Sequence, residues 1–347
     1  SGLAWPVSSK LPPTACPGNH PQPVRTLPGA HWSSRDGHAS AVFKDRLWVL
    51  GGWDRGGLSD VWSSPDGDRW RQEPIAPWPR RKAHTAAVFH DRLWVLGGSL
   101  GVEQTADVWS TEDGQTWRQD TERAPWGPRN NHAVVVFHDR IWVLGGWGAG
   151  PTEEGSTDAP NQDGRDLDDV WWSDDGQTWH LATDHAAWSP RNGHAATVFK
   201  DKLWVLGGWG EQGDGSEGNL ADAWWSDDGQ SWHRTDSPIP WSPRNGHAAI
   251  AFADRLWLIG GWGPTHTATG QTTDGNLSDV WWTQDGITWH PATSQASWLP
   301  RNGHTLEVFK HRLWLIGGWS EFAGKKGLND LWWVGSTDRD SALNEKR

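Results

Sequence analysis

The stretch WSPRNGHAATVFKDKLWVLGGWG, from Trp188 to Gly210, holds two short apolar runs that are joined by a polar turn and closed by a glycine pair. Closely similar stretches run from Trp241 to Gly263 and from Trp298 to Ser320. Self-similarity at a spacing of 46 to 62 residues indicates a repeat protein, in which each repeat is one small structural unit. The glycine pair marks six repeats, at 51–52, 97–98, 145–146, 207–208, 260–261 and 317–318.

Each repeat supplies four short strands. Two are the apolar runs on either side of the polar turn. Two more lie in a segment such as DVWWSDDGQTW (Asp169–Trp179), which is typical of a hairpin that turns at Asp-Gly. Four strands in a repeat of about 50 residues are the pattern of a β-propeller blade. The sequence therefore predicts an all-β fold, a six-bladed β-propeller of four-stranded antiparallel blades.

The repeats resemble those of the kelch family, in which Gly-Gly follows the second strand, an arginine and a histidine open the first strand, and a tryptophan lies in the fourth. The resemblance covers about residues 24–335. One departure is the aromatic residue before the glycine pair, which is usually tyrosine in the family. It is tryptophan in every repeat here, at Trp48, Trp94, Trp142, Trp204, Trp257 and Trp314.

The two ends of the chain are expected to complete one blade together. The last repeat ends at NDLWWVGSTD (Asn329–Asp338) without a further Asp-Gly hairpin. Trp32 precedes Arg35 as a tryptophan precedes the arginine in every other repeat, which puts Pro23–Gly29 in the place of an outer strand. We predict that this N-terminal strand closes the ring and removes its open edge. The expected divisions are an N-terminal tail at 1–19, the propeller at 20–335 and a C-terminal tail at 336–347.

The composition argues against several classes of function. A net charge of −12 is unsuited to a nucleic-acid partner, and no window approaches 18 consecutive apolar residues, so no membrane span is expected. The chain has 33 tryptophans but no tyrosine, which excludes the copper-radical oxidases related to galactose oxidase, because these need tyrosines as ligand and radical. We expect a monomer in an extracellular or periplasmic compartment, with a processed N-terminus.

The loops after the glycine pairs and the loops into the first strands must lie on the same side of the ring, because the strands are antiparallel. These loops vary in length, and variable loops on a rigid scaffold commonly carry function. An arginine recurs on this side and could bind a carboxylate or phosphate, as the resemblance to kelch adaptors that grip acidic peptides implies, or could bond to loop carbonyls. The six are Arg35, Arg81, Arg129, Arg191, Arg244 and Arg301.

A histidine follows each of these arginines by three residues. Six histidines around a channel could hold a metal ion, although bonding to backbone groups as each strand begins is the preferred interpretation. They are His38, His84, His132, His194, His247 and His304. The acidic loop 151–169 offers a second candidate metal site, for Ca²⁺, but it lacks several of the acids that a calcium loop needs. No cofactor is assigned.

Tryptophans form the third recurring set. Some follow the glycine pairs, and others precede the arginines by three residues. Exposed tryptophans in loops suit a sugar ring or a cation, whereas buried ones would pack between loops and hold the repeats together. The candidates for ligand binding are Trp53, Trp147, Trp209, Trp262 and Trp319 after the glycine pairs, and Trp188, Trp241 and Trp298 before the arginines.

Glu307 breaks the symmetry of the innermost strands. The other repeats carry Ala41, Ala87, Val135, Thr197 and Ile250 at this position. A carboxyl group in such surroundings should have a raised pKa, which suits a general acid or base, or it could form a salt bridge to a neighbouring arginine or histidine.

We therefore predict a ligand-binding propeller that recognises a carbohydrate or a small anionic or cationic ligand at the loop face. One alternative is an enzyme at the same mouth, similar to the sugar-acid mutarotases and isomerases among bacterial kelch propellers, with arginine holding the carboxylate and Glu307 moving protons. A cyclase-like enzyme would instead use tryptophans to stabilise a cationic intermediate. Another alternative is a protein-interaction scaffold.

Overall fold

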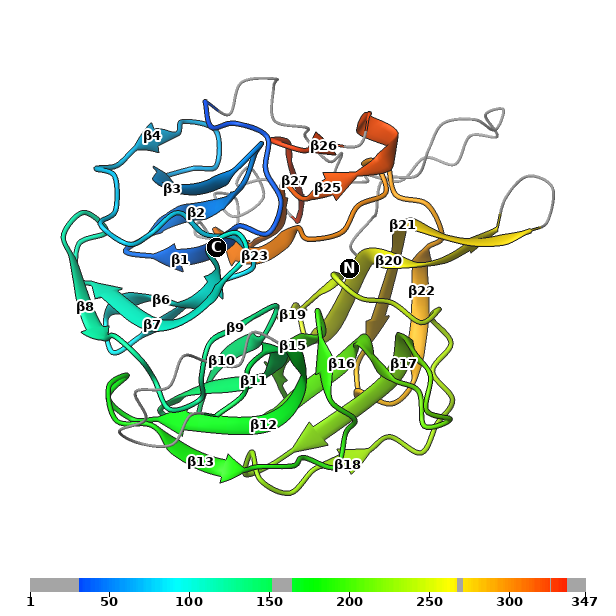
Figure 1. The fold of residues 1–347 in the computed structure, drawn as a ribbon. Helices are drawn as coiled ribbons and strands as arrows, with labels where there is room; N and C mark the ends of the chain where they lie inside the picture. The colour runs from blue at the N-terminus through cyan, green and yellow to red at the C-terminus, as the bar shows by residue number, and fades with distance from the viewer. Residues whose placement is uncertain (1–30, 152–163, 267–270, 325, 336–347) are drawn as a thin grey trace, which may run out of the picture.

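The computed structural model describes residues 31–151, 164–266, 271–324 and 326–335, and nearly all of its regular elements are β-strands (Figure 1). The first repeat forms a four-stranded antiparallel sheet of β1 (Ala39–Phe43), β2 (Arg46–Trp53), β3 (Gly57–Ser64) and β4 (Arg71–Gln72). The second repeat repeats this order in β5 (Thr85–Phe89), β6 (Arg92–Ser99), β7 (Gln104–Thr111) and β8 (Trp117–Thr121).

The third and fourth repeats share one ten-stranded sheet, because the short strand β14 (Arg191–Asn192) joins them. Its other strands are β9 (Arg129–Asn130), β10 (Ala133–Phe137), β11 (Arg140–Gly148), β12 (Arg165–Ser173), β13 (His180–Thr183), β15 (Ala195–Phe199), β16 (Lys202–Glu211), β17 (Glu217–Ser226) and β18 (His233–Arg234). The fifth repeat has β19 (Ala248–Phe252), β20 (Arg255–His266), β21 (Thr272–Thr283) and β22 (Trp289–Thr293).

The sixth repeat contains β23 (Thr305–Phe309), β24 (Arg312–Ile316) and β27 (Leu331–Gly335) in one sheet, with the strand pair β25 (Trp319–Ser320) and β26 (Lys326–Gly327) and the 3-10 helix η1 (Glu321–Ala323) between them. The predicted outer strand at Pro23–Gly29 and both predicted tails lie outside the described residues. Trp32 nevertheless belongs to a buried hydrophobic cluster shared by the first and sixth repeats, which includes Trp314 and Trp333, and the N–H of Arg35 donates to the carbonyl of Leu328 (3.0 Å).

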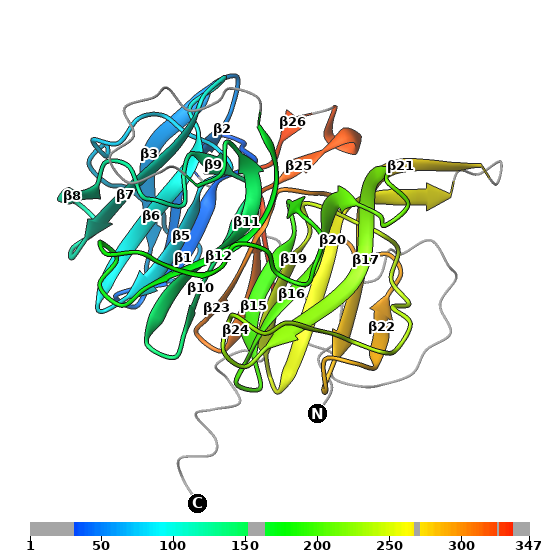
Figure 2. The same ribbon diagram turned by 60° about the horizontal axis from the view of Figure 1, so that its bottom comes forward.

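The innermost strands of the six repeats form a closed ring. Each of β1, β5, β10, β15, β19 and β23 contacts the next in this order, and β23 contacts β1 (Figures 1 and 2). The predicted all-β propeller of four-stranded antiparallel sheets is confirmed.

A cycle of six backbone hydrogen bonds connects the repeats at the inner rim. Each N–H donor is a residue with positive φ, from 50° to 62°, and its acceptor is the equivalent carbonyl of the preceding repeat. The six residues are Gly37, Ala83, Asn131, Gly193, Gly246 and Gly303. Four of them are glycine, which adopts this left-handed conformation without steric cost. The cycle fixes the spacing of the innermost strands where they begin.

The glycine pairs are required by close packing. A Cβ atom on Gly207 (φ +53°) would lie 3.0 Å from Cε1 of His247, in the next repeat. A Cβ atom on Gly208 (φ +111°) would lie 2.8 Å from Cβ of His194, in the same repeat. The strand pairing is also irregular here, because the register between β16 and β17 shifts from Leu206 to Gly208. Each glycine pair therefore lets two histidines approach the strand backbone.

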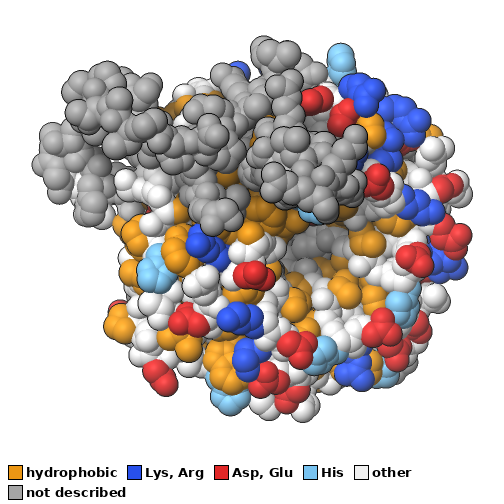
Figure 3. Space-filling model, turned by 180° about the vertical axis from the view of Figure 1, so that it is seen from behind, with side chains coloured by type: hydrophobic (Ala, Val, Ile, Leu, Met, Phe, Trp, Pro, Cys, Tyr) orange, Lys and Arg blue, Asp and Glu red, His pale blue; other side chains and the backbone are white. Residues whose placement is uncertain are grey.

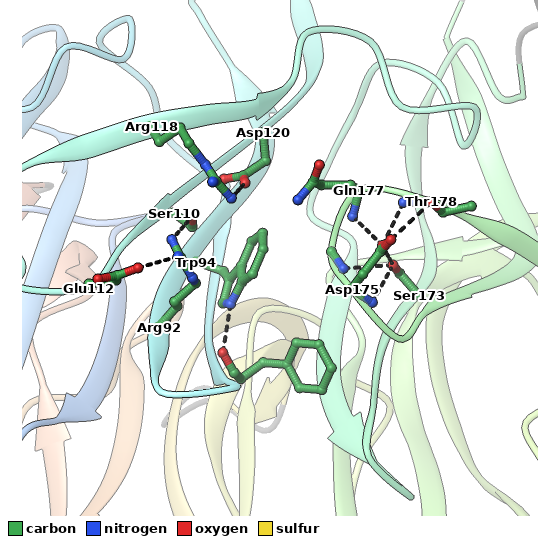
Figure 4. A network of polar contacts seen from close by, with 12 residues as sticks. Arg92, Trp94, Ser110, Glu112, Arg118, Asp120, Ser173, Asp175, Gln177 and Thr178 are labelled. Atoms are coloured by element: carbon green, nitrogen blue, oxygen red, sulfur yellow. Dashed lines mark hydrogen bonds and ion pairs between the residues drawn. The ribbon is translucent and has the colours of Figure 1, made fainter.

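In five of the repeats the tryptophan before the glycine pair packs against the Asp-Gly turn of the following repeat. The Trp94 indole N–H donates to the carbonyl of Phe89 (2.9 Å), and a Cβ on Gly176 would meet the Trp94 ring at 2.3 Å. Asp175 holds the same turn by accepting the N–H groups of Gln177 (2.7 Å) and Thr178 (2.6 Å), as Figure 4 shows. This departure from the family pattern therefore fills the space between neighbouring repeats.

Candidate functional site

The six arginines are buried and do not face the channel. Each has an exposed fraction of 0%. Arg191 Nη1 donates to Asp222 Oδ1 (2.8 Å) and to the carbonyl of Gly207 (2.9 Å), while Nη2 donates to Asp222 Oδ2 (2.8 Å). The other arginines pair in the same way with Asp60, Asp107, Asp169, Asp279 and Asp330. The prediction that these arginines bind a ligand is therefore corrected, because their N–H groups form hydrogen bonds inside the fold.

The aspartates of these pairs form a motif that the sequence analysis missed. Each lies two residues before a tryptophan of the third strand, and that indole N–H donates to the same carboxylate, as from Trp224 to Asp222 (2.8 Å). Burial raises the pKa of Asp222, but the hydrogen bonds and charge of Arg191 outweigh this and hold the pKa below its usual range. Removing one member of such a buried pair costs about 3–5 kcal/mol of stability.

The tryptophans that precede the arginines, here called the core tryptophans, are also buried. They are Trp32, Trp78, Trp126, Trp188, Trp241 and Trp298, with exposed fractions of 0–4%. Trp188 packs edge-on against Trp232 (ring centroids 5.9 Å apart), and the Arg191 guanidinium lies 5.7 Å from its ring centre. The prediction that Trp188, Trp241 and Trp298 bind a ligand is therefore corrected, because their faces are covered by the repeat itself.

The six histidines are buried next to the backbone cycle. With the residues that precede them they line a central hollow of about 140 Å³. Burial and the neighbouring arginine lower the pKa of His132 and of His194 to about 3, so both are neutral at physiological pH. Among the described residues, no group of three or more His, Cys, Asp or Glu side chains is arranged to hold a metal ion. Most of the candidate calcium loop, residues 152–163, lies outside the described residues.

The tryptophans after the glycine pairs behave differently. Trp53, Trp147, Trp209, Trp262 and Trp319 each keep part of their surface exposed, and we call them the tryptophan ring. Each pairs through its backbone with the residue that follows the buried arginine, as Trp209 does with Asn192. The residue after each pairing partner belongs to the backbone cycle at the inner rim. The tryptophan ring therefore surrounds the mouth of the channel on the loop face.

The second repeat interrupts the tryptophan ring. Ser99 takes the place of the tryptophan and keeps the same backbone pairing, with Lys82. The Lys82 ammonium lies 4.4 Å from the ring centre of Trp53. Burial raises the pKa of Asp36, and the charge of Lys82 acts against this rise. A cation of the chain itself therefore occupies the face of Trp53. No such cation lies over Trp209, Trp262 or Trp319 in the described part of the chain.

Amide and carboxylate groups lie between the tryptophans. Asn192 donates to Asp166 (2.7 Å), Asn245 to Asn219 (2.6 Å), and Asn276 to Asn302 (3.2 Å). Burial raises the pKa of Asp166 to about 6, although the hydrogen bond from Asn192 opposes it. These groups join neighbouring repeats at the rim, and the sequence analysis did not single them out.

Glu307 lies in the seam between the last and the first repeat. Ser40 Oγ donates to its Oε1 (2.7 Å), and burial raises its pKa to about 7. At the same seam, His38 Nε2 and Thr305 Oγ1 lie 3.1 Å apart. No second titrating side chain among the described residues bonds to Glu307, and the predicted salt bridge to arginine or histidine is not formed there.

The faces of the propeller differ in relief. On the loop face the β20–β21 hairpin projects at the same end as β25 and β26 (Figure 2). Beside this hairpin lies a groove of about 1050 Å³. The opposite face, seen in Figure 3, has hydrophobic side chains around a central hollow and charged side chains toward its rim. The loop face therefore combines partly exposed indoles with a groove large enough for a ligand or a peptide segment.

Comparison with known proteins identifies the class. The family model described as the KLHDC2/KLHL20/DRC7 Kelch-repeats domain matches residues 21–208, more than half of the chain. The chain therefore belongs to the kelch-repeat family, which confirms the resemblance seen in the sequence. The solved structure of YjhT superposes with a TM-score of 0.67 at 18% identity, over 88% of this chain and 96% of that one. At this identity the similarity shows the fold alone.

Curated relatives match over shorter segments. The chain is 26% identical over 155 residues to the leucine-zipper-like transcriptional regulator 1 homolog of Drosophila melanogaster, covering 42% of this chain and 14% of that protein. It is 29% identical over 188 residues to an F-box/kelch-repeat protein of Arabidopsis thaliana, covering 49% of this chain and 37% of that protein. The matched segments therefore span less than two-fifths of these relatives.

Proposed function

We propose that the protein binds a partner polypeptide through its loop face, with the tryptophan ring as the main contact surface. The observation that carries this proposal is the partial exposure of five indoles around one rigid channel mouth. Tryptophan is among the residues most enriched at protein interfaces, where it gives large contact area at low entropic cost. The kelch-repeat fold is consistent with a protein-interaction scaffold. The described residues also contain no helix with the length and apolar character to span a membrane.

A carbohydrate is the second candidate ligand, because an exposed indole face can stack on a sugar ring. The observation that favours it is the pair formed by Trp262 and Trp319, whose ring centres are 6.2 Å apart beside the amide of Asn302. A small anionic ligand is not proposed, since the arginines are buried. No catalytic step is proposed, because Glu307 has Ser40 rather than a second titrating group as its partner among the described residues.

The test uses a triple variant, Trp209→Ser/Trp262→Ser/Trp319→Ser. Serine fits this backbone position, because Ser99 already occupies it in the second repeat. A phage-displayed library of random 12-residue peptides is selected on the wild-type protein, and the wild type is applied in parallel to a glycan array. A double variant that removes exposed apolar side chains elsewhere, Leu181→Ser/Ile287→Ser, serves as the control.

We expect enriched peptides whose affinity falls at least tenfold in the triple variant and stays unchanged in the control. Enriched glycans with the same dependence, and no enriched peptides, would replace the polypeptide by a carbohydrate. Peptides that bind the triple variant as well as the wild type, or no binding of either class, would contradict the proposal.

A further inference from the structure

The groove beside the β20–β21 hairpin has features that the proposed function does not use. Its floor and one wall come from the fifth repeat, and the turn of the sixth repeat supplies the other wall through Glu321 and Phe322. Four prolines, at 240, 264, 291 and 300, line it. Because proline has no N–H donor and a fixed φ, these walls are stiff and largely apolar. Phe322 is 62% exposed at the rim, which leaves an aromatic face for a ligand.

The lining of the groove carries negative charge only. Asp274, Asp279 and Glu321 line it, whereas no lysine, arginine or histidine does. Asp279 is already paired with Arg244. Within the described residues, neither Asp274 nor Glu321 forms an ion pair. The groove therefore presents two carboxylates that no cation of the described residues neutralises.

The position of Glu321 is fixed by backbone contacts. Its Oε1 accepts the N–H of Asn276 (3.1 Å), and the N–H of Glu321 donates to the Asn276 side-chain oxygen (2.9 Å). A Cβ on Gly275 would lie 2.8 Å from Glu321 Oε1, so a larger residue there would displace the end of the Glu321 side chain. These contacts hold Glu321 beside Gly275, the strand residue that follows Asp274, and no described residue bonds to its Oε2.

The groove begins where the tryptophan ring is most crowded. Pro264 follows Trp262 by two residues, and Glu321 follows Trp319 by two residues. The indoles of Trp262 and Trp319 are themselves 6.2 Å apart. An extended segment that contacts this pair would therefore run on into the groove, with an aromatic surface first and carboxylates after it.

We propose that this groove receives a segment of the partner polypeptide that bears a lysine or arginine side chain. The cation would lie between Asp274 and Glu321, and its aliphatic stem would pack on the proline walls and Phe322. Two carboxylates in one groove, neither in an ion pair with a described residue, give the charge complementarity, and guanidinium is the group best suited to bind two oxygen acceptors. This inference rests on the proposed function, since it names the chemistry of one part of the same partner.

The experiment uses pools of acetylated and amidated random hexapeptides in which one position is fixed as arginine, lysine, glutamate or leucine. Binding of each pool is measured by fluorescence anisotropy to the wild type and to Asp274→Asn/Glu321→Gln. Both replacements keep side-chain shape, and glutamine can still accept the Asn276 N–H. The control is Glu211→Gln/Glu217→Gln, which removes the same charge from exposed paired positions of the fourth repeat.

We expect the arginine and lysine pools to bind the wild type at least tenfold more tightly than the glutamate and leucine pools. This preference should weaken with added salt, disappear in Asp274→Asn/Glu321→Gln and persist in the control. Equal binding of all pools, or a preference that survives in Asp274→Asn/Glu321→Gln, would overturn the inference.

The Trp209→Ser/Trp262→Ser/Trp319→Ser variant separates the two proposals. Loss of binding in this variant with no effect of Asp274→Asn/Glu321→Gln would leave the tryptophan ring as the contact surface and reject the groove. The reverse pattern would support a basic ligand in the groove and contradict the role of the tryptophan ring.

Discussion

The core tryptophans and the tryptophan ring occupy the same side of the propeller, yet they differ in burial and in whether every repeat keeps the tryptophan. The core tryptophans are buried, as Trp188 is beneath the outer-strand indole of Trp232 and the buried Arg191 guanidinium, and the position is tryptophan in all six repeats. The tryptophan ring is partly exposed, and the second repeat replaces it by Ser99 without a change in backbone pairing. A position that all repeats share is therefore structural here, whereas a position that tolerates an exception is open to function.

The largest loss of stability is expected at low pH, through the buried channel histidines. Burial lowers the pKa of His132 and His194 to about 3, and it also lowers the pKa of the other four channel histidines. Unfolded histidine titrates near 6.5, so the unfolded chain binds more protons between about pH 6.5 and 3, and stability is lost as the pH falls. Each histidine should cost about 1.4 kcal/mol per pH unit. Urea unfolding midpoints at pH 7.5, 6 and 5 measure this, and equal midpoints would contradict the burial of the histidines.

Trp188→Ala should lower the free energy of unfolding by about 3–5 kcal/mol, as for other large-to-small core substitutions of tryptophan. The change removes a side chain with an exposed fraction of 1% that packs on Trp232. Chemical unfolding followed by circular dichroism gives the value. A loss below about 1 kcal/mol would remove the distinction between the two tryptophan sets.

Glu307→Gln tests a second exception to the repeat symmetry. The raised pKa of about 7 means that the folded state holds a proton that the unfolded state has released above about pH 4.5. The stabilising contribution is present below pH 4.5 and is lost as the pH rises through 7. The variant should therefore be about 3 kcal/mol more stable than the wild type at pH 8 and equal to it near pH 4.5. A difference that does not change with pH would show that Glu307 is not desolvated.

The backbone cycle allows a paired test in opposite directions. Gly193 and Ala83 occupy equivalent positions with φ of +59° and +52°. Gly193→Ala should destabilise by about 1 kcal/mol, because an L side chain is strained in this conformation, and its Cβ would find ordinary contact distances. Ala83→Gly should stabilise by a similar amount. Thermal unfolding of both variants measures the pair, and shifts of the same sign would argue against the cycle.

The smallest effect on stability is expected at the tryptophan ring. Trp209→Ser should change the free energy of unfolding by less than about 0.5 kcal/mol, since the side chain is partly exposed and serine is accepted at the equivalent Ser99. Chemical unfolding gives the value beside that of Trp188→Ala. A loss comparable to that of Trp188→Ala would make the tryptophan ring a structural element.

The fold could be predicted from the sequence because its determinants are local. The glycine pairs, the Asp-Gly turns and the alternation of apolar runs lie within single repeats, and each performs the same task six times or nearly so. The spacing of Trp32 and Arg35 predicts the seam between the chain ends, and the buried cluster that Trp32 shares with Trp314 agrees with it. The outer strand expected at Pro23–Gly29 stays a prediction.

The site was harder to predict because its decisive contacts cross the variable loops. Each arginine pairs with an aspartate 25 to 40 residues further along the chain, so the two lie on opposite sides of a loop of changing length. The signal was nevertheless present, since every repeat carries an aspartate two residues before a tryptophan. The core tryptophans are buried because they pack on a second indole of the repeat. The spacing of residues in the sequence does not reveal this contact. The groove depends on a turn and a hairpin from different repeats.

The central claim, that the tryptophan ring binds the partner, is tested most directly by ¹⁹F NMR of the protein labelled with 5-fluorotryptophan. Signals of Trp188, Trp209, Trp262 and Trp319 are assigned from single variants, and a peptide selected on the wild type is then titrated. We expect changes in the signals of Trp209, Trp262 and Trp319 and none in that of Trp188. Saturable binding that leaves all three tryptophan-ring signals unchanged would contradict the claim.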